Sequence, residues 1–363
     1  MEKLQYVIED RTIAELLGVQ NFSTDESAIL ELVKNAYDAQ ASYIKLTFKS
    51  DTLTVLDDGV GMNIDDIKSK WMHIGKSTKD YTTVLENNRI RVLAGSKGIG
   101  RFALARLGQE AAVMSKRSGD DGILWETDWS SSSVFIDKNH TQTGTTLVIK
   151  KLRSKWGKQK VENLIAFLSK TYNDDSMKII VSHPDISSEV VPYITELTPG
   201  INCLSRIDLN YDSSSNELTI DIQSDEFSDR AKRYCKDLDL HHFYQKVNIF
   251  DEFKDSQEWD LPAEELKDTL TNLGDFSACF GYRIATSKVE MEKFLYKHDS
   301  LPADPLRGVI LYRNAFSISS YEGKKDWLGF GKRSRKSPAA ATHPTGSWRV
   351  RENQIAGKVE IDK

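Results

Sequence analysis

Three polar side chains in the stretch from Asp25 to Ala39 could do chemistry together. Glu31, Asn35 and Asp38 follow one another at intervals of four and three residues. On a helix, at about 100° per residue, they share a sector about 60° wide. Carboxylates accept protons and hydrogen bonds, and amides bind polar ligands, so this face could form part of a binding or catalytic site. No Lys or Arg is expected directly among the three side chains, and the common alternative is a polar stripe that faces water.

The same stretch carries the signals of a helix that would position these side chains. Ser23 with Glu26 three residues later has the pattern of a capping box at a helix start. Good helix formers follow, without Gly or Pro. The opposite side of the helix is predicted to face a core through Ile29, Leu32, Val33 and Ala36.

A second group of chemically useful residues follows a predicted strand. Residues 52–56 alternate in polarity and lead into the sequence Asp57-Asp58-Gly59-Val60-Gly61-Met62. A strand that ends in such a turn fixes a carboxylate at the rim of a sheet, and its glycines allow a flat ligand to approach the backbone. The alternative is an ordinary Asp-Gly turn.

A glycine-rich cluster forms the third group and has the pattern of an anion site. It reads Gly95-Ser96-Lys97-Gly98-Ile99-Gly100-Arg101, and a helical run over 102–107 follows it. Free N–H groups at such a helix start attract anions, and Lys97 and Arg101 add positive charge. The spacing Gly98-x-Gly100-x-x-Ala103 also fits a dinucleotide loop, which keeps an NAD(P) oxidoreductase as a remote alternative. Against that alternative, the segments that follow are predicted strands: 110–115, 122–128, 133–137 and 144–150.

Length, charge and cysteine content limit the class of protein. The 363 residues allow two domains, and the net charge of −5 gives no general sign of nucleic-acid binding. The basic run at 150–160 is most simply solvated; together with a second run at 324–336, it is the alternative DNA-binding surface. No apolar run approaches the roughly 18 residues of a membrane span, so no membrane partner is expected. Cys203, Cys235 and Cys279 form neither a metal pattern nor a disulfide framework, which favours a reducing, cytoplasmic compartment.

The remainder of the chain predicts a second α/β unit. Residues 79–91 are polar and are predicted to be mobile. A hairpin is expected around residue 214, residues 224–275 have a polar and mostly helical pattern, and the chain stops directly after a strand over 355–361. That stop predicts a fragment of a longer protein.

Taken in order, four motifs resemble the nucleotide-binding boxes of the GHKL ATPases, the group of DNA gyrase B, the ninety-kilodalton heat-shock chaperone, histidine kinases and MutL. They are Glu31-x-x-x-Asn35-x-x-Asp38-Ala39, Asp57-x-Gly59-x-Gly61-Met62, the cluster from Gly95 to Ala103, and Gly144-Thr145. Each motif alone is weak, whereas four in order at compatible spacing are specific. The likeness covers residues 12–150, and the glycine-lysine-glycine form of the cluster is most similar to prokaryotic MORC-like members.

The resemblance implies an α+β fold in two parts. Residues 1–175 would form a Bergerat-type α/β sandwich, a mixed sheet with helices on one face. Residues 185–363 would form a transducer-like α/β domain with a polar helical insert at about 224–275. Family members send a basic residue from the transducer to the γ-phosphate, and the candidates are Lys332, Arg333, Arg335 and Lys336, unless that residue lies beyond the chain's end.

The resemblance also implies roles for the site residues. Asp57 would accept the adenine amino group, Asn35 would give Mg²⁺ one oxygen, Glu31 would orient and deprotonate the attacking water, and Asp38 would organise ligand water or the base. Lys97 would reach the phosphates. The other expected ATP contacts are Gly59, Gly61, Met62, Gly95, Ser96, Gly98, Ile99, Gly100, Arg101 and Thr145. Asp58 departs from the family pattern, in which Asn is more usual.

The implied activity is slow, Mg²⁺-dependent ATP hydrolysis in which ATP closes a lid and drives homodimerisation, with DNA or a protein as the partner. The alternatives are a heat-shock-type chaperone and a nucleotide-gated DNA clamp with little hydrolysis. A histidine kinase is less favoured, because no phosphoacceptor helix precedes the nucleotide motifs.

Overall fold

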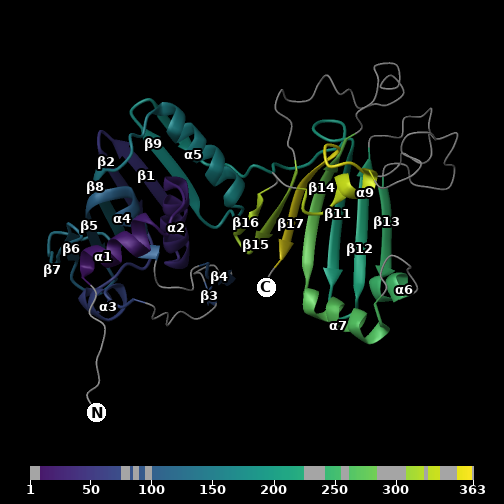
Figure 1. The fold of residues 1–363 in the computed structure, drawn as a ribbon, viewed down its shortest axis with the longest axis horizontal. Coiled ribbons are helices and arrows are strands. Elements are labelled where there is room, and N and C mark those ends of the chain that lie inside the picture. The colour runs from purple at the N-terminus through teal and green to yellow at the C-terminus, as the bar shows by residue number, and fades with distance from the viewer. Residues whose placement is uncertain are drawn as a thin grey trace, which may run out of the picture. The chain divides into compact units, whose positions relative to one another are not determined.

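A computed structural model describes residues 9–74, 82–84, 90–94, 100–224, 242–254, 261–283, 308–322, 326–335 and 350–361. The chain divides into two compact units (Figure 1). Residues 1–169 and 174–191 make the first unit, and residues 170–173 and 192–363 make the second.

The first unit is built on an eight-stranded sheet in the order β10-β9-β1-β2-β8-β5-β6-β7. Its strands are β1 (Tyr43–Lys49), β2 (Thr52–Asp57), β5 (Gly108–Lys116), β6 (Ile123–Thr127), β7 (Ser132–Ile136), β8 (Gly144–Leu152), β9 (Lys178–His183) and β10 (Ile186–Glu189). β1 runs parallel to β9, and the other described pairs are antiparallel. This mixed, largely antiparallel order lacks the repeated βαβ units of a dinucleotide-binding domain, which speaks against the oxidoreductase alternative.

Helices cover the apolar side of this sheet. They are α1 (Asp10–Ala14), which continues as a π-helical turn (Glu15–Val19), α2 (Asp25–Asp38), α3 (Ile64–Asp66), which continues as a π-helical turn (Ile67–Trp71), α4 (Ala103–Leu107) after a 3₁₀ turn (Gly100–Phe102), and α5 (Lys158–Thr171). Along β1, buried Ile44, Leu46 and Phe48 alternate with the exposed Lys45 and Lys49, as expected for a strand with one face on a core. The predicted α+β class, a mixed sheet with helices on one face, is confirmed. A short pair, β3 (Thr82–Val84) with β4 (Ile90–Val92), completes the described elements of this unit.

The central helix α2 begins one residue later than its sequence predicts. Thr24 is the N-cap: its hydroxyl accepts from Ser27 N at 3.1 Å, and Ser27 Oγ accepts from Thr24 N at 3.3 Å. The predicted Ser23–Glu26 capping box is therefore wrong, because the short Ser27 hydroxyl closes the reciprocal pair in place of a Glu. The predicted core face is confirmed, since Ile29, Leu32, Val33 and Ala36 are all buried.

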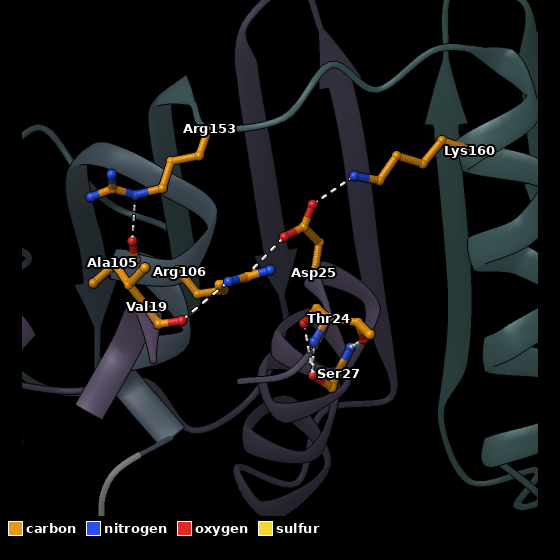
Figure 2. A network of polar contacts seen from close by, with 8 residues as sticks. All are labelled: Val19, Thr24, Asp25, Ser27, Ala105, Arg106, Arg153 and Lys160. Atoms are coloured by element: carbon orange, nitrogen blue, oxygen red, sulfur yellow. Dashed lines mark hydrogen bonds and ion pairs between the residues drawn. The ribbon is translucent and has the colours of Figure 1, made fainter. Parts of the chain in front are cut away.

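A buried carboxylate fixes the N-terminus of α2 to two other helices (Figure 2). Asp25 Oδ1 accepts from Arg106 Nε of α4 at 3.1 Å, and Asp25 Oδ2 accepts from Lys160 Nζ of α5 at 2.6 Å. Burial acts to raise the pKa of Asp25, but hydrogen bonds from Lys160 and Ser154 and the charges of Lys160 and Arg106 outweigh it and hold the pKa below its usual range. The start of α2 is thus held in a fixed place by ion pairs as well as by packing.

We expect Asp25→Ala to lower the free energy of unfolding of the first unit by about 3 kcal/mol, because it leaves two cations without their shared partner. Urea denaturation at pH 7 would measure the change. The difference in free energy of unfolding between the parent and Asp25→Ala should shrink as the pH falls below 3.8, the ordinary pKa of an Asp. It should vanish below the lowered pKa of Asp25, because the carboxyl is then protonated in the folded protein as well as in the unfolded chain. Glu189→Ala, which removes an exposed partner of Lys178 in the same unit, is the control and should cost under about 1 kcal/mol. An equal loss in both variants would contradict the prediction.

The second unit has a seven-stranded sheet in the order β13-β12-β11-β14-β17-β15-β16. The strands are β11 (Ser205–Asp212), β12 (Glu217–Ser224), β13 (His242–Asn248), β14 (Phe276–Tyr282), β15 (Gly308–Arg313), β16 (Phe316–Glu322) and β17 (Ile355–Ile361), and the described helices are α6 (Ile249–Lys254), α7 (Ala263–Leu273) and α9 (Phe330–Arg335). One core cluster lies around Ala278, Phe280, Val309, Ile355 and Val359, and a second is formed by Ile194, Ile310 and Tyr312.

Part of the predicted helical insert is a strand. β13 pairs with β12 along its whole length, and the cross-strand ion pair Lys246–Glu217 supports the pairing. α6 and α7 follow it as helices, whereas residues 225–241 and 255–260 lie outside the described ranges.

Two smaller expectations can be compared with the described part of the chain. Cys203 and Cys279 are free thiols, and Cys235 lies outside that part. Among the helices that the structure describes, none combines the length and the apolar character needed to cross a membrane.

Candidate functional site

The acid at the end of β2 lies beside the start of β8. Asp57 pairs with Thr145 across the two strands, and Asp57 Oδ1 accepts from Gly59 N at 3.0 Å. The sequence places Asp57 here because the alternating strand ends in a turn rich in glycine. Asp57 and Thr145 therefore lie side by side at the same end of two neighbouring strands in the middle of the sheet.

Gly59 brings these strand ends against the C-terminal end of α2. A Cβ atom added to Gly59 would lie 2.7 Å from Ala39 O, and Val60 N donates to the same carbonyl at 2.8 Å. Ala39 N in turn donates to Asn35 O at 2.9 Å. Asp57 and the amide-bearing helix therefore meet through Gly59, with Asn35 one helical turn further along.

A second glycine forces the path of the turn. Gly61 has a φ of +67° and lies so close to β5 that a Cβ atom would come within 2.0 Å of Lys116 O. Any other residue would clash there and be strained. The turn is thus held between α2 and β5.

A buried serine connects the turn to the fourth predicted motif, Gly144-Thr145. Ser115, fully buried on β5, donates to Gly144 O at 2.9 Å and accepts from Met62 N at 2.8 Å. Its hydroxyl also lies 2.9 Å from Thr145 Oγ1. Sequence reasoning missed Ser115, because nothing distinguishes it from other small residues of a predicted strand.

Burial changes the acid strength of Asp57. Desolvation raises the pKa of Asp57 from 3.8 to about 6, against the lowering effect of the Gly59 backbone hydrogen bond, and the charge of Asp58 adds to the rise. A carboxylate kept from water while still ionised at neutral pH is a strong acceptor for a ligand N–H group.

The neighbouring acid has a structural task. Asp58 accepts from Ser42 N at 2.8 Å and from Tyr43 N at 3.0 Å, and also from the Ser42 hydroxyl. These bonds fix the chain between α2 and β1. They explain how an acid is accommodated where the family usually has Asn.

The second glycine motif contacts the polar face of α2 at its last glycine. A Cβ atom on Gly100 would lie 3.3 Å from Asn35 Nδ2 and 3.5 Å from Glu31 Oε2. Glu31 and Asn35 therefore face the start of the 3₁₀ turn and α4. The expected contacts Gly95, Ser96, Lys97, Gly98 and Ile99 lie outside the described residues.

The polar face of α2 includes a lysine, contrary to the prediction. Lys34 Nζ lies 2.8 Å from Glu31 Oε1, and both side chains are partly buried. Residues three apart on a helix are neighbours, and the long side chain of Lys34 reaches around to Glu31. The prediction considered only where each side chain leaves the helix and did not include the length of the Lys34 side chain.

Asp38 holds the strand that leads into the glycine cluster. Its Oδ1 accepts from Ala94 N at 2.7 Å. Nearby Arg91, on β4, is 2% exposed and donates to the carbonyls of Tyr37, Ala41 and Ser176 at 2.8, 3.1 and 3.0 Å. Arg91 was expected in a mobile polar segment; its buried guanidinium instead binds carbonyls at the end of α2.

Arg101 has protein partners in the structure. Its guanidinium donates to Lys70 O at 3.0 Å and His73 O at 2.7 Å, and burial lowers its pKa to about 10. The side chain thus joins the glycine motif to the turn after α3.

Four basic residues of the second unit were candidates for a contact with the γ-phosphate. Lys332 and Arg333 are exposed on α9, while the side chains of Arg335 and Lys336 are outside the described part.

Comparison with known proteins agrees with this geometry. Residues 22–159 match the family of "Histidine kinase-, DNA gyrase B-, and HSP90-like ATPase" domains. The first unit therefore contains an ATPase domain of the GHKL superfamily.

Several curated proteins are similar to this chain at low identity. "Putative type II restriction enzyme HgiDII" of Herpetosiphon aurantiacus is 24% identical in an alignment that covers 46% of this chain and 30% of that protein. A mitochondrial TNF receptor-associated protein 1 homolog of Dictyostelium discoideum is 27% identical in an alignment that covers 45% of this chain and 27% of its own length. Chaperone protein HtpG of Aliarcobacter butzleri is 24% identical in an alignment that covers 68% of this chain and 42% of its own length. The chain spans less than half the length of these relatives.

Proposed function

We propose that this protein binds Mg²⁺-ATP between α2 and the end of β2 and hydrolyses it slowly. One observation carries the proposal: Gly59 brings Asp57 against the C-terminal end of α2, and Gly100 lies against Asn35 and Glu31 further back on the same helix. In this arrangement the acid Asp57 suits a purine, the amide of Asn35 suits a metal-bound phosphate chain, and the second acid, Glu31, suits a water molecule.

In this proposal Asp57 selects adenine. Its buried carboxylate accepts the N–H of the exocyclic amino group, whereas guanine presents an oxygen at that position and would be repelled. Gly59, Gly61 and Met62 line the base, and Thr145, held by Ser115, supports Asp57 from β8.

Asn35 and Glu31 would act on the phosphate end. The Asn35 amide oxygen fits Mg²⁺, which takes few protein ligands and keeps phosphate oxygens and waters for the rest. When bound, Mg²⁺ would neutralise charge on the phosphates. Glu31 would orient a water molecule and take its proton, while the glycine motif from Gly95 to Arg101 surrounds the phosphates.

Asp38 is assigned a supporting role. Its bond to Ala94 N fixes the entry to the glycine motif, and its position on the face of Glu31 and Asn35 allows it to order ligand water. Arg101 contributes by joining the same motif to the turn after α3.

ATP would act as a conformational signal, closing a lid and driving homodimerisation in a cytoplasmic, MORC-like protein. The second unit would be the transducer, with Lys332, Arg333, Arg335 or Lys336 as the basic residue. The family of the first unit supports the dimerisation, and DNA or a protein would be the partner.

The test is the mass of the full chain by light scattering, with Mg²⁺ and a non-hydrolysable ATP analogue. The mass is expected to double with the analogue, and to stay at one chain with ADP or when EDTA removes Mg²⁺. A constant mass with analogue bound would contradict dimerisation, and no binding of ATP would contradict the whole proposal.

Two other functions are supported by the relatives. The HtpG matches favour a chaperone, which would suppress aggregation of an unfolded client in an ATP-dependent way. The restriction-enzyme relative and the basic run 150–160 favour a nucleotide-gated DNA clamp with little hydrolysis. In that run Lys151, Arg153 and Lys160 already contact Glu110, Ala105 and Asp25, respectively. DNA binding that weakens with rising salt concentration would favour the clamp.

The remote oxidoreductase alternative has its own test, which is competition between labelled ATP and NADPH for the site.

A further inference from the structure

The two carboxylate oxygens of Glu31 have different surroundings. Oε1 is bound by Lys34 Nζ at 2.8 Å. Oε2 faces the second glycine motif, 3.5 Å from the place of a Cβ atom on Gly100. One oxygen is therefore held by the helix itself, and the other is turned toward the proposed phosphate site.

The helix that carries this pair is fixed along its length. Thr24 and Ser27 cap its start, Asp25 joins it to α4 and α5, and Ile29 and Val33 are fully buried in the core. Lys34 and Glu31 lie on this one rigid element, and their side chains are 22% and 30% exposed. Their separation therefore does not depend on any movement between elements.

A free glutamate side chain samples several rotamers. An ammonium at Oε1 limits the carboxylate to orientations in which Oε2 points toward Gly100. Catalysis by a general base requires this kind of fixed geometry, because small misplacements of a reacting group cost much of the rate. The contribution of the Lys34–Glu31 pair to the stability of the fold is expected to be small, because such pairs of residues three apart on a helix contribute little. Its value to the protein would then lie in the orientation of Glu31.

We infer that Lys34 is a positioning residue for hydrolysis: it holds Glu31 through Oε1 so that Oε2 receives the proton of the attacking water. The inference rests on the proposed function, in which Glu31 is the base. Lys34 touches neither water nor phosphate in this role, and its charge acts through Glu31.

Steady-state ATPase measurements on the full chain test it. Lys34→Met, which keeps most of the length of the side chain and removes the charge, is expected to lower kcat about tenfold and to leave KM for ATP within about twofold. Lys34→Arg keeps a cation in reach and should restore most of kcat. In a Glu31→Gln background, Lys34→Met should cause no further loss, because the two residues act as a unit.

A matched control is available in the second unit. Lys254 forms an ion pair with Asp251 at the same spacing and the same 2.8 Å distance, and Lys254→Met should leave kcat unchanged. Thermal melts would show that each variant is folded, and Lys34→Gln replaces Lys34→Met if the latter does not fold.

The outcomes separate this inference from the proposed function. A parent chain that hydrolyses no ATP contradicts the proposed function. An active parent with an unchanged or raised kcat in Lys34→Met overturns only the inference, as does a change confined to KM, which would place Lys34 on the nucleotide.

Discussion

Glu31→Ala is expected to lower ATP hydrolysis by about 10²- to 10⁴-fold, the usual contribution of a general base, while the affinity for ATP stays within about twofold. The structure separates the two effects. Glu31 reaches the glycine motif near Gly100, whereas Asp57 and the turn through Gly61 lie at the other end of the proposed site. Removing the base therefore leaves the groups that would hold adenine untouched.

Single-turnover hydrolysis and equilibrium binding of a labelled ATP analogue would measure the two quantities separately. Glu110→Ala is the control, because Glu110 is a partly exposed acid on β5 paired with Lys151 and should change neither value. Hydrolysis by Glu31→Ala at the parent rate would exclude Glu31 as the base. A large loss of affinity would mean instead that Glu31 helps to hold the nucleotide.

Local patterns were enough to predict the parts of the site that depend on one or two elements. The periodicity of α2 gave its buried face, and the alternation of β2 placed Asp57 at a strand end. The Gly144-Thr145 turn was recognised as the start of a strand, but its pairing with Asp57 depends on the order of strands in the sheet. The family resemblance implied that both residues contact ATP, but the strand order that pairs them comes only from the structure.

Contacts between distant segments could not be predicted from the same patterns. Arg91 lies in a polar run that would ordinarily face water, yet its planar fork binds carbonyls from α2 and from Ser176. Asp25 resembles any acid in the first turn of a helix, and only the approach of Arg106 and Lys160 makes it a buried anchor. The flexible reach of Lys34 toward Glu31 was missed for a similar reason, because spacing describes where a side chain starts and not where its end lies.

The second large effect is expected at Asp57, where Asn should weaken ATP binding by about 100-fold. Asp57 Oδ1 already accepts from Gly59 N, so a ligand N–H needs the other oxygen. An Asn side chain has only one oxygen, and either orientation turns its NH₂ group toward an N–H donor. Calorimetric titration of ATP would measure the loss, and Asp51→Asn, in the exposed turn before β2, should bind as the parent does.

The pH dependence of binding follows from the raised pKa of Asp57. Because that pKa is about 6 in the folded protein, the carboxylate is ionised at pH 7.5 and mostly protonated at pH 5. Affinity should fall about tenfold per pH unit below 6. Adenosine is the suitable ligand for this measurement, because it has no phosphate that titrates in the same range. A flat profile from pH 7.5 to 5 would show that the adenine does not meet this carboxylate.

The same burial predicts that Asp57→Asn makes the first unit more stable. A carboxyl whose folded pKa is raised from 3.8 to about 6 contributes stability below pH 3.8 that is lost as the pH rises through 6. At pH 8 the ionised group therefore costs about 2 to 3 kcal/mol, and Asn, which can still accept from Gly59 N, removes that cost. Urea unfolding should show the variant more stable than the parent at pH 8 and equal to it near pH 4. A residue whose replacement weakens binding and raises stability is kept for its ligand, whereas a stability loss at pH 8 would make Asp57 a structural acid.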